Sequence, residues 1–251
     1  MGARKIQLER ELAKNYELPT IEGAPHLVAL TRDNVARVEA MIRTDSNYRI
    51  SLGDEKVNAK YSPYWLEKLE SCLKGEPVAE KIEDVIDNVV KLLDKENSTH
   101  LNTDGVGQKE MARRILAHKE TLLNDLRNRN FDLIETLSVK TIPLPGKRGR
   151  ENLSFASKFC HYACFYIFNG EVAQDNFSIY DGVVARALPK YLKHFSITIK
   201  NLGINIDIKK IKNKDYYEYS KAIDAVIKAS GDEISRNGFD HLVWYYFKGQ
   251  R

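Results

Sequence analysis

Apolar residues recur every three or four positions through most of the chain, and this spacing is typical of amphipathic helices. Thr31 and Asp33 give a helix-start signal, and Ser62 before Pro63 gives another. Gly75 and Pro77 end the helix that Pro63 begins. We therefore predict helices over residues 1–14, 31–42, 62–73, 78–95, 108–129, 131–140, 154–168, 181–195, 215–231 and 239–247.

Two segments break this helical pattern. Residues 141–153, "TIPLPGKRGRENL", contain two prolines, two glycines and basic residues, and so predict a loop. Residues 195–212 alternate apolar and polar positions with β-branched residues, which predicts a short β excursion or an irregular one. We expect a mainly α fold over 1–251 as a single domain. Its two helical lobes are roughly 1–100 with 215–251, and 101–195.

Composition and charge narrow the class of protein. The net charge of +4 over 251 residues permits a nucleic-acid partner without requiring one. Three scattered cysteines argue against a disulfide scaffold and fit a reducing compartment. The N-terminus has no apolar signal segment, and no stretch approaches the length needed to cross a bilayer. We expect a cytoplasmic monomer, in a bacterial-type cytosol or nucleoid, without a membrane partner or a cofactor.

Lys158 lies in "SFASKFCHY", one of the most apolar regions of the chain. The helical stripe expected to be buried is Ala156, Cys160, Ala163, Cys164 and Ile167, and Lys158 falls outside it. A lysine there either extends its ammonium into solvent or serves as a nucleophile. The start of a helix disfavours a positive charge, and partial burial acts in the same direction. Both effects favour the neutral amine, which is the form that attacks carbon.

Asp181 lies in "FSIYDGVVARAL", after an apolar run and directly before a helical pattern. This is a helix N-cap position, where amide groups and the helix dipole stabilise the carboxylate. An ordinary cap is one interpretation. The other is an anion fixed next to a nucleophilic amine, where it stabilises a positive sugar carbon or assists proton transfer in Schiff-base chemistry.

These two stretches carry a family resemblance. "SFASKFCHY" followed by "FSIYDGVVARAL" resembles the helix-hairpin-helix DNA glycosylases, and most of all their 8-oxoguanine-glycosylase-like branch. The C-terminal "FDHLVWYYFKG" is similar to the aromatic closing helix of those proteins. The resemblance implies that Lys158 attacks the sugar C1′ and forms a Schiff base, that Asp181 assists, and that double-stranded DNA with a damaged or modified base is the partner.

The sequence departs from the family pattern at the hairpin. The usual motif is Gly-x-Gly-x-Lys, whereas Ser154 and Ala156 replace the two glycines here. A different loop is then expected to approach the DNA phosphates. Lys147, Arg148 and Arg150 in "GKRGR" are candidates, because glycines between basic residues allow a close approach. A solvated basic loop is the alternative.

A second lysine–aspartate pair has the same spacing as the first. Lys109 ends a literal Gly105-Val-Gly107-Gln-Lys and precedes Asp132 by 23 residues, as Lys158 precedes Asp181. The neighbouring residues favour the 158/181 pair. The helix after Lys109 is highly charged, and no apolar run precedes Asp132 as one precedes Asp181. Gly105, Gly107 and Lys109 remain candidates for a phosphate-binding turn.

Aromatic residues near this chemistry are candidates for stacking on an extruded base, namely Phe155, Tyr180 and Trp244. Cys160, His161 and Cys164 do not predict a metal site, because no second cluster completes four ligands, and the cysteines are expected in the core.

Two other functions are compatible with the residues. One is a Mg²⁺-dependent nuclease that uses Asp181, Asp207 and Lys209. The other is a helical DNA-binding module without catalysis. The excised base stays open as well, between an 8-oxoguanine-like lesion in repair and a modified base in foreign or phage DNA in antiviral defence.

Overall fold

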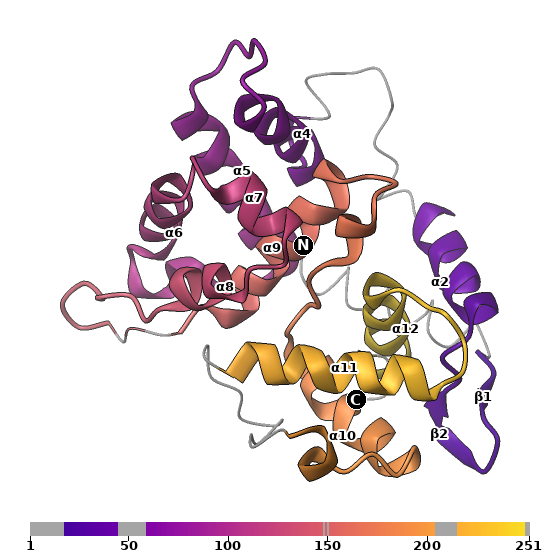
Figure 1. Cartoon of the computed structure of the whole chain (residues 1–251). Coiled ribbons are helices and arrows are strands. Elements are labelled where there is room, and N and C mark those ends of the chain that lie inside the picture. The colour runs from indigo at the N-terminus through magenta and orange to yellow at the C-terminus, as the bar shows by residue number, and fades with distance from the viewer. Residues whose placement is uncertain (1–17, 45–58, 148, 150, 204–214, 249–251) are drawn as a thin grey trace. The chain divides into compact units, whose positions relative to one another are not determined.

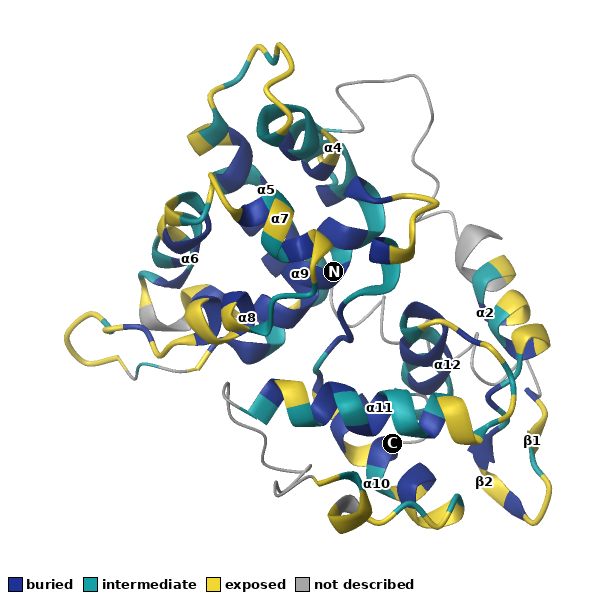
Figure 2. Ribbon diagram, in the orientation of Figure 1, coloured by how far each residue is buried: buried dark blue, intermediate teal, exposed yellow. Residues whose placement is uncertain are grey.

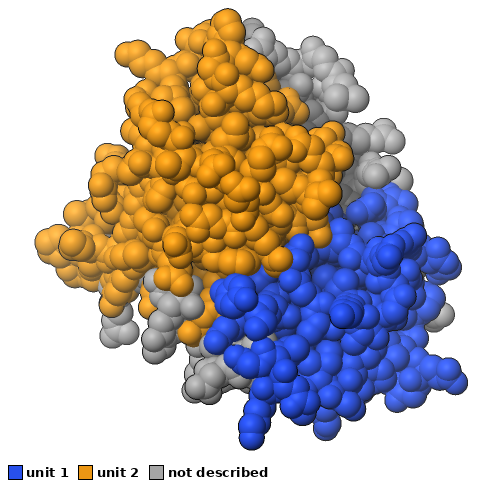
Figure 3. Space-filling model, viewed as in Figure 1, with its two compact units in different colours: residues 1–49, 178–211, 217–251 blue, residues 50–177, 212–216 orange. Residues whose placement is uncertain are grey.

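The chain folds into two compact units (Figures 1 and 3). The computed structural model describes residues 18–44, 59–147, 149, 151–203 and 215–248. Unit 1 comprises Met1–Arg49, Ser178–Ile211 and Tyr217–Arg251, and unit 2 comprises Ile50–Phe177 and Lys212–Tyr216. Residues 50–100 thus group with the segment that contains Lys158, whereas the expected lobes grouped them with the two ends of the chain.

Unit 2 is built from helices. Its elements in chain order are α4 (Ser62–Leu73), α5 (Ile82–Asn97), the 3-10 helix η1 (Leu101–Asp104), α6 (Gly107–Ala117), α7 (Leu122–Arg127), α8 (Phe131–Ser138), α9 (Leu153–Ile167) and the 3-10 helix η2 (Val172–Asp175). Their bounds lie close to the helices predicted from apolar spacing. The segment predicted as one helix over 108–129 divides into α6 and α7 at the 118–121 turn.

Helix α9 forms the centre of unit 2. It packs against α4, α5, α7, α8 and η2. Ala156, Cys160, Ala163 and Cys164 are completely buried and Ile167 nearly so, which confirms the predicted stripe. Burial also extends around the helix, because every residue from Phe155 to His161 is buried (Figure 2). A helix that is buried on most of its faces is expected only where other helices surround it.

Unit 1 combines a small hairpin with four α-helices among its described residues. Its elements are β1 (Thr20–Ile21), β2 (Ala24–Val28), α2 (Arg32–Thr44), α10 (Gly182–His194), the 3-10 helix η3 (Ile199–Leu202), α11 (Tyr216–Ala229, whose first residue groups with unit 2) and α12 (Arg236–Lys248). Helix α12 packs against α2, α10 and β2. The Tyr191 hydroxyl donates a hydrogen bond to the Val28 carbonyl at 2.9 Å, which ties α10 to the hairpin.

The mainly α fold is confirmed, but the cap predicted at Ser62 is corrected and a short hairpin is added. The antiparallel strands lie at Thr20–Val28, where Gly23 has φ +73° in the turn, and the sequence pattern had not indicated them. In the predicted β excursion, Ile199–Leu202 is a 3-10 helix and residues 204–212 lie outside the described residues. Ser62 is the first residue of α4 rather than its cap, because its hydroxyl donates to the Glu96 carboxylate at 2.5 Å instead.

Among the described residues, no helix is long and apolar enough to cross a membrane. The helix predicted over residues 1–14 lies outside the described residues.

Candidate active site

Lys158 occupies the second turn of α9 and is buried. Its exposed fraction is 9%, so it is not the solvated lysine of the first interpretation. Its Nζ donates to the backbone carbonyl of Asn97 over 3.4 Å, a long hydrogen bond. No acidic side chain in the described part of unit 2 forms an ion pair with it. Buried lysines are normally paired, so a buried amine with one weak acceptor is an unusual arrangement.

The acceptor of this contact is the last residue of α5. Asn97 is held in place because its Nδ2 donates to the Leu93 carbonyl at 3.0 Å and its Oδ1 accepts from the Tyr162 hydroxyl at 3.3 Å. The carbonyls at the end of a helix carry the negative pole of its dipole. The local sequence indicates the α9 dipole and partial burial, which both disfavour an ammonium, but not the end of α5. The end of α5 stabilises one, so the two helix ends act in opposite directions on Lys158.

Asp181 is the N-cap of α10, as predicted. Its Oδ1 accepts from the backbone amides of Val183 at 2.8 Å and Val184 at 2.9 Å. Within the described residues, Oδ2 accepts no hydrogen bond. The residue is 9% exposed. The carboxylate is therefore rigidly oriented by one oxygen while the other oxygen remains available.

The segment that leads to Asp181 is fastened at two carbonyls. Nδ1 of His161 lies 2.8 Å from the Phe177 carbonyl oxygen, and because a carbonyl can only accept, Nδ1 carries the proton. Two residues later, the Ile179 carbonyl accepts from the Tyr219 hydroxyl at 2.8 Å. The first bond attaches the segment to α9 within unit 2, and the second attaches it to α11 within unit 1.

The two predicted catalytic residues belong to different units, because the chain passes from unit 2 to unit 1 between Phe177 and Ser178. Lys158 lies in the first of these and Asp181 in the second. A joint role of the two side chains in one reaction is therefore part of the proposal below.

The alternative pair has a different environment. Lys109 is exposed in the first turn of α6 and has no ion pair within the described residues. Asp132 is exposed at the second residue of α8, whose N-cap is Asn130. The preference for the 158/181 pair thus agrees with the burial of both its members and with the capping geometry of Asp181.

The structure brings two predicted phosphate-binding segments together. Gly105 has φ +83°, and a Cβ there would lie 2.7 Å from the Leu144 Cδ1, so the turn before α6 lies against the loop between α8 and α9. Gly107 is buried as the first residue of α6. Lys147 is exposed in that loop, whereas Arg148 and Arg150 lie outside the described residues.

The three aromatic candidates differ in accessibility. Phe155 is 1% exposed and belongs to the core, so it presents no ring face to a base, and this prediction is corrected. Tyr180 is half-buried and meets Tyr219 edge-on at 5.4 Å between ring centroids. Trp244 is half-buried, with the Lys248 Nζ 3.5 Å from its ring centroid.

The cysteines behave as core residues. Burial raises the pKa of Cys160 and Cys164 well above the usual range for a thiol. The described residues contain no group of three potential metal-ligating side chains. Asp207 and Lys209 of the nuclease alternative lie outside the described residues.

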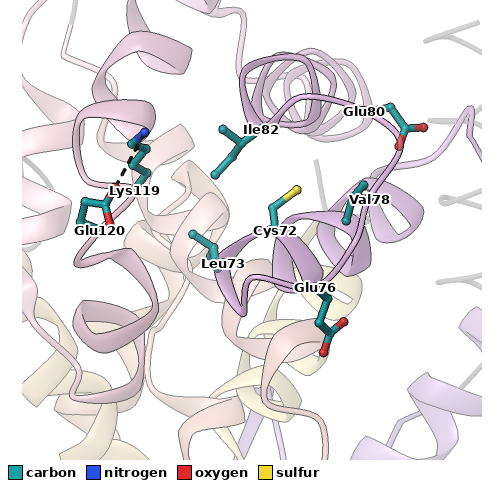
Figure 4. A pocket seen from close by; sticks show the side chains of 8 residues that line it. All are labelled: Cys72, Leu73, Glu76, Val78, Glu80, Ile82, Lys119 and Glu120. Atoms are coloured by element: carbon teal, nitrogen blue, oxygen red, sulfur yellow. Dashed lines mark ion pairs between the residues drawn. The ribbon is translucent and has the colours of Figure 1, made fainter.

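A shallow hollow in unit 2 lies between the end of α4, the loop that follows it, and the turn after α6 (Figure 4). Its lining residues are Cys72, Leu73, Glu76, Val78, Glu80, Ile82, Lys119 and Glu120. None of them belongs to α9 or α10, so the hollow is not part of the candidate active site.

Sequence reasoning had not assigned a role to Asn97, Tyr162 or His161. Tyr162 lies one turn after Lys158, and that spacing was the available signal. Asn97 had none, because its contact with Lys158 joins positions 61 residues apart.

Comparison with known proteins adds one match. Residues 54–165 match the family model HI_0787_N, whose description is "N-terminal domain". The match covers less than half of the chain and lies within unit 2, where it includes Lys158. No curated protein and no solved structure matches the chain.

Proposed function

We propose that this protein is a DNA glycosylase with AP lyase activity, which excises a damaged or modified base through a Schiff base on Lys158. The observation that carries the proposal is the buried Lys158 amine, which has one long hydrogen bond and no carboxylate partner in the described part of unit 2. A structural lysine in such a position is usually paired with a carboxylate, whereas the acceptor recorded for this one among the described residues is the Asn97 carbonyl. The resemblance of "SFASKFCHY" and "FSIYDGVVARAL" to the glycosylases supports the same role.

The chemistry requires two functional groups. The neutral amine of Lys158 attacks C1′, and the glycosidic bond breaks with its electron pair leaving on the base, which takes up a proton. The nitrogen then loses one of its two protons, and the C1′–O4′ bond breaks as the sugar ring opens, with O4′ taking up a proton. The product is a protonated imine whose nitrogen keeps its last proton. Removal of a C2′ proton then expels the 3′ phosphate, and hydrolysis of the imine releases the lysine.

Asp181 supplies the negative charge in this proposal. Positive charge develops at C1′ as the base departs, and a fixed carboxylate stabilises it more than a mobile one does. The two hydrogen bonds from backbone amides to Oδ1 support this role, because they fix the orientation of the carboxylate. Within the described residues, Oδ2 accepts no hydrogen bond and is available to a substrate.

The target base is either an 8-oxoguanine-like lesion or a modified base of foreign DNA. Both are proposals, because neither the site residues nor the family match identifies a base. In each case we propose that the protein binds double-stranded DNA and acts as a monomer. We propose that it works in the same compartment as the DNA, the cytosol or nucleoid of a bacterial-type cell.

The test is borohydride trapping on a panel of duplexes. The panel contains 8-oxoguanine, other oxidised bases, modified cytosines, modified phage DNA and a natural abasic site, all in EDTA. We expect a covalent protein–DNA adduct with the abasic duplex and with at least one modified base. Preference for a modified cytosine over 8-oxoguanine would favour the antiviral role over repair.

Two results would contradict the proposal. Strand cleavage that appears only after Mg²⁺ is added would favour the nuclease. DNA binding without an adduct on any substrate, including the abasic duplex, would leave a non-catalytic DNA-binding module.

A further inference from the structure

Asp94 is a buried carboxylate in the last turn of α5. It is 7% exposed, and among the described residues three neutral groups donate to it. Oδ1 accepts from the Thr99 hydroxyl at 2.6 Å and from the Leu101 amide at 3.0 Å. Oδ2 accepts from the Gln108 side-chain amide at 2.8 Å. Burial of a charge is costly without hydrogen bonds, so these three donors hold the carboxylate inside the fold.

The Leu101 amide would have a different acceptor in a continuous helix. If α5 went on past Asn97, the amide of residue 101 would donate to the carbonyl of residue 97, four positions earlier. Here α5 ends at Asn97, Ser98 adopts a left-handed conformation, and the Leu101 amide donates to Asp94 instead. The Asn97 carbonyl is thereby left to accept from the Lys158 Nζ, at 3.4 Å.

The turn between α5 and η1 has an uncommon backbone. Ser98 has φ +50° and His100 has φ +56°, so both lie in the left-handed region although neither is glycine. Such residues persist where the surrounding structure fixes them. The two hydrogen bonds to the Asp94 Oδ1 come from residues 99 and 101, which alternate with the two left-handed residues. The carboxylate therefore fixes the turn that follows Asn97.

Asp94 is itself held by a neighbouring helix. Within unit 2, α5 packs against both α6 and α9 (Figure 1). Gln108 of α6 donates to Oδ2, so each oxygen of the carboxylate has a donor and rotation of the group would break hydrogen bonds. The carboxylate thus links α6 to the turn that determines where the acceptor of Lys158 lies.

We infer that Asp94 is a positioning residue for Lys158. It accepts the Leu101 amide and fixes the turn, so that the Asn97 carbonyl remains free to hold the amine in one orientation. The inference rests on the proposed glycosylase function and deepens it, because attack on C1′ depends on the orientation of the amine. A single long hydrogen bond suits this task, since little is lost when the nitrogen bonds to carbon.

The chain offers a matched pair of substitutions. Thr99→Val removes a buried hydroxyl that donates to a carboxylate of α5, and Ser62→Ala removes another, which donates to Glu96 at 2.5 Å. Both hydrogen bonds stabilise the last turn of α5. The Thr99 bond also shapes the turn after Asn97, whereas the Ser62 bond does not. A positioning role therefore predicts different effects on catalysis from two similar losses.

The experiment separates the reaction step from binding and from stability. Borohydride trapping on the abasic duplex is measured in single turnover at saturating protein, together with affinity for the same duplex and unfolding in urea. We expect Asp94→Ala to trap about tenfold more slowly and Thr99→Val about threefold more slowly, with affinities within about twofold of the wild type. Asp94→Asn should trap within about twofold of the wild type, because its amide oxygen still accepts from residues 99 and 101. Ser62→Ala should trap at the wild-type rate even though it loses stability.

The contrary results differ from one another. If the wild type forms no adduct on the abasic duplex, this inference and the glycosylase proposal are both wrong. If it forms the adduct and Thr99→Val and Asp94→Ala trap at its rate, Asp94 has no positioning role and the glycosylase proposal stands. Rates that follow stability in every variant, Ser62→Ala included, would show that Asp94 only stabilises the fold, which also overturns the inference. If Asp94→Ala does not fold, the comparison of Thr99→Val with Ser62→Ala decides.

Discussion

The starts of α6 and α9 look alike in sequence but differ in structure. Each has small residues, then a lysine, and an aspartate follows each lysine after 23 positions. At α6 the lysine is Lys109, which is exposed and lies beside charged neighbours. At α9 the lysine is Lys158, which is 9% exposed in a helix packed on by five other elements.

This difference shows that the same local motif can place a lysine in two different surroundings. An exposed ammonium binds phosphate well through charge and is a poor nucleophile, because water keeps it protonated. A buried amine without a counter-charge is suited to attack carbon. The same spacing therefore predicts two roles, and the experiments below separate them in order of expected effect.

Replacing each lysine by glutamine gives the largest contrast. We expect Lys158→Gln to abolish borohydride trapping, a loss of about a thousandfold or more, because an amide cannot form a Schiff base. Lys109→Gln should retain trapping but bind duplex DNA less tightly, with a salt dependence shallower by about one charge. Trapping yields and binding at several salt concentrations check this. Loss of trapping in Lys109→Gln alone would reverse the assignment.

The two aspartates give the next contrast. Asp181→Asn should slow base excision by about 10²–10³-fold, since it removes a fixed charge from a dry site. Its melting temperature should change little, because asparagine caps helices about as well as aspartate. Asp132→Asn serves as the matched control and should leave excision unchanged. Single-turnover rates and thermal melts of both variants test this, and an Asp181→Asn protein with wild-type rates would remove Asp181 from the mechanism.

A third prediction concerns the hydrogen bond from His161 in α9 to the Phe177 carbonyl, which attaches the segment before Asp181 to α9 and is called the tether below. His161→Asn places a side-chain N–H near the position of Nδ1, whereas His161→Gln places it farther out and His161→Phe removes it. Removing it leaves the Phe177 carbonyl without this donor, at a cost of about 1–3 kcal/mol.

We expect excision to fall about tenfold in His161→Phe and His161→Gln and to recover in His161→Asn, if the tether positions Asp181. Stability alone is measured separately by urea unfolding. A rate that follows stability in all three variants, without recovery in His161→Asn, would show that His161 is only structural.

The smallest effect is expected at the start of α6, where the charges stabilise the fold. Hydrogen bonds from Arg113, and then from Arg114, lower the pKa of Glu110. The stability that this gives is present above the ordinary glutamate pKa and is lost as pH falls through the lowered folded value. Glu110→Gln should cost about 0.5 kcal/mol or less at pH 7, because the pair is screened by solvent.

Urea unfolding at pH 7 and over a series of acidic pH values measures this difference. The wild type and Glu110→Gln should converge as the pH falls below the lowered folded pKa of Glu110, where the residue is protonated in both the folded and the unfolded chain. A difference that persists unchanged in acid would mean that shape rather than charge carries the effect of Glu110.

Local sequence determined most of the helices in the described residues. The stripe of Ala156, Cys160, Ala163, Cys164 and Ile167 indicated both α9 and its buried face. The position of Asp181, after an apolar run and directly before a helical pattern, predicted the N-cap of α10, which the structure confirms. These features depend on hydrogen bonds and contacts between residues at most one turn apart, so the residue pattern contains the required information.

Features that join distant positions were decided only by the tertiary structure. Lys158 is buried because helices from elsewhere in the chain surround α9, and its acceptor is the carbonyl of Asn97 at the end of α5. Local periodicity left open whether Lys158 is solvated or is a partly buried nucleophile, because it shows only that the lysine lies outside the apolar stripe. Ser62 likewise binds Glu96 rather than capping its helix. In each case a long-range contact outweighs a local preference of about 1 kcal/mol, and no pattern within one helix specifies which residue that contact joins.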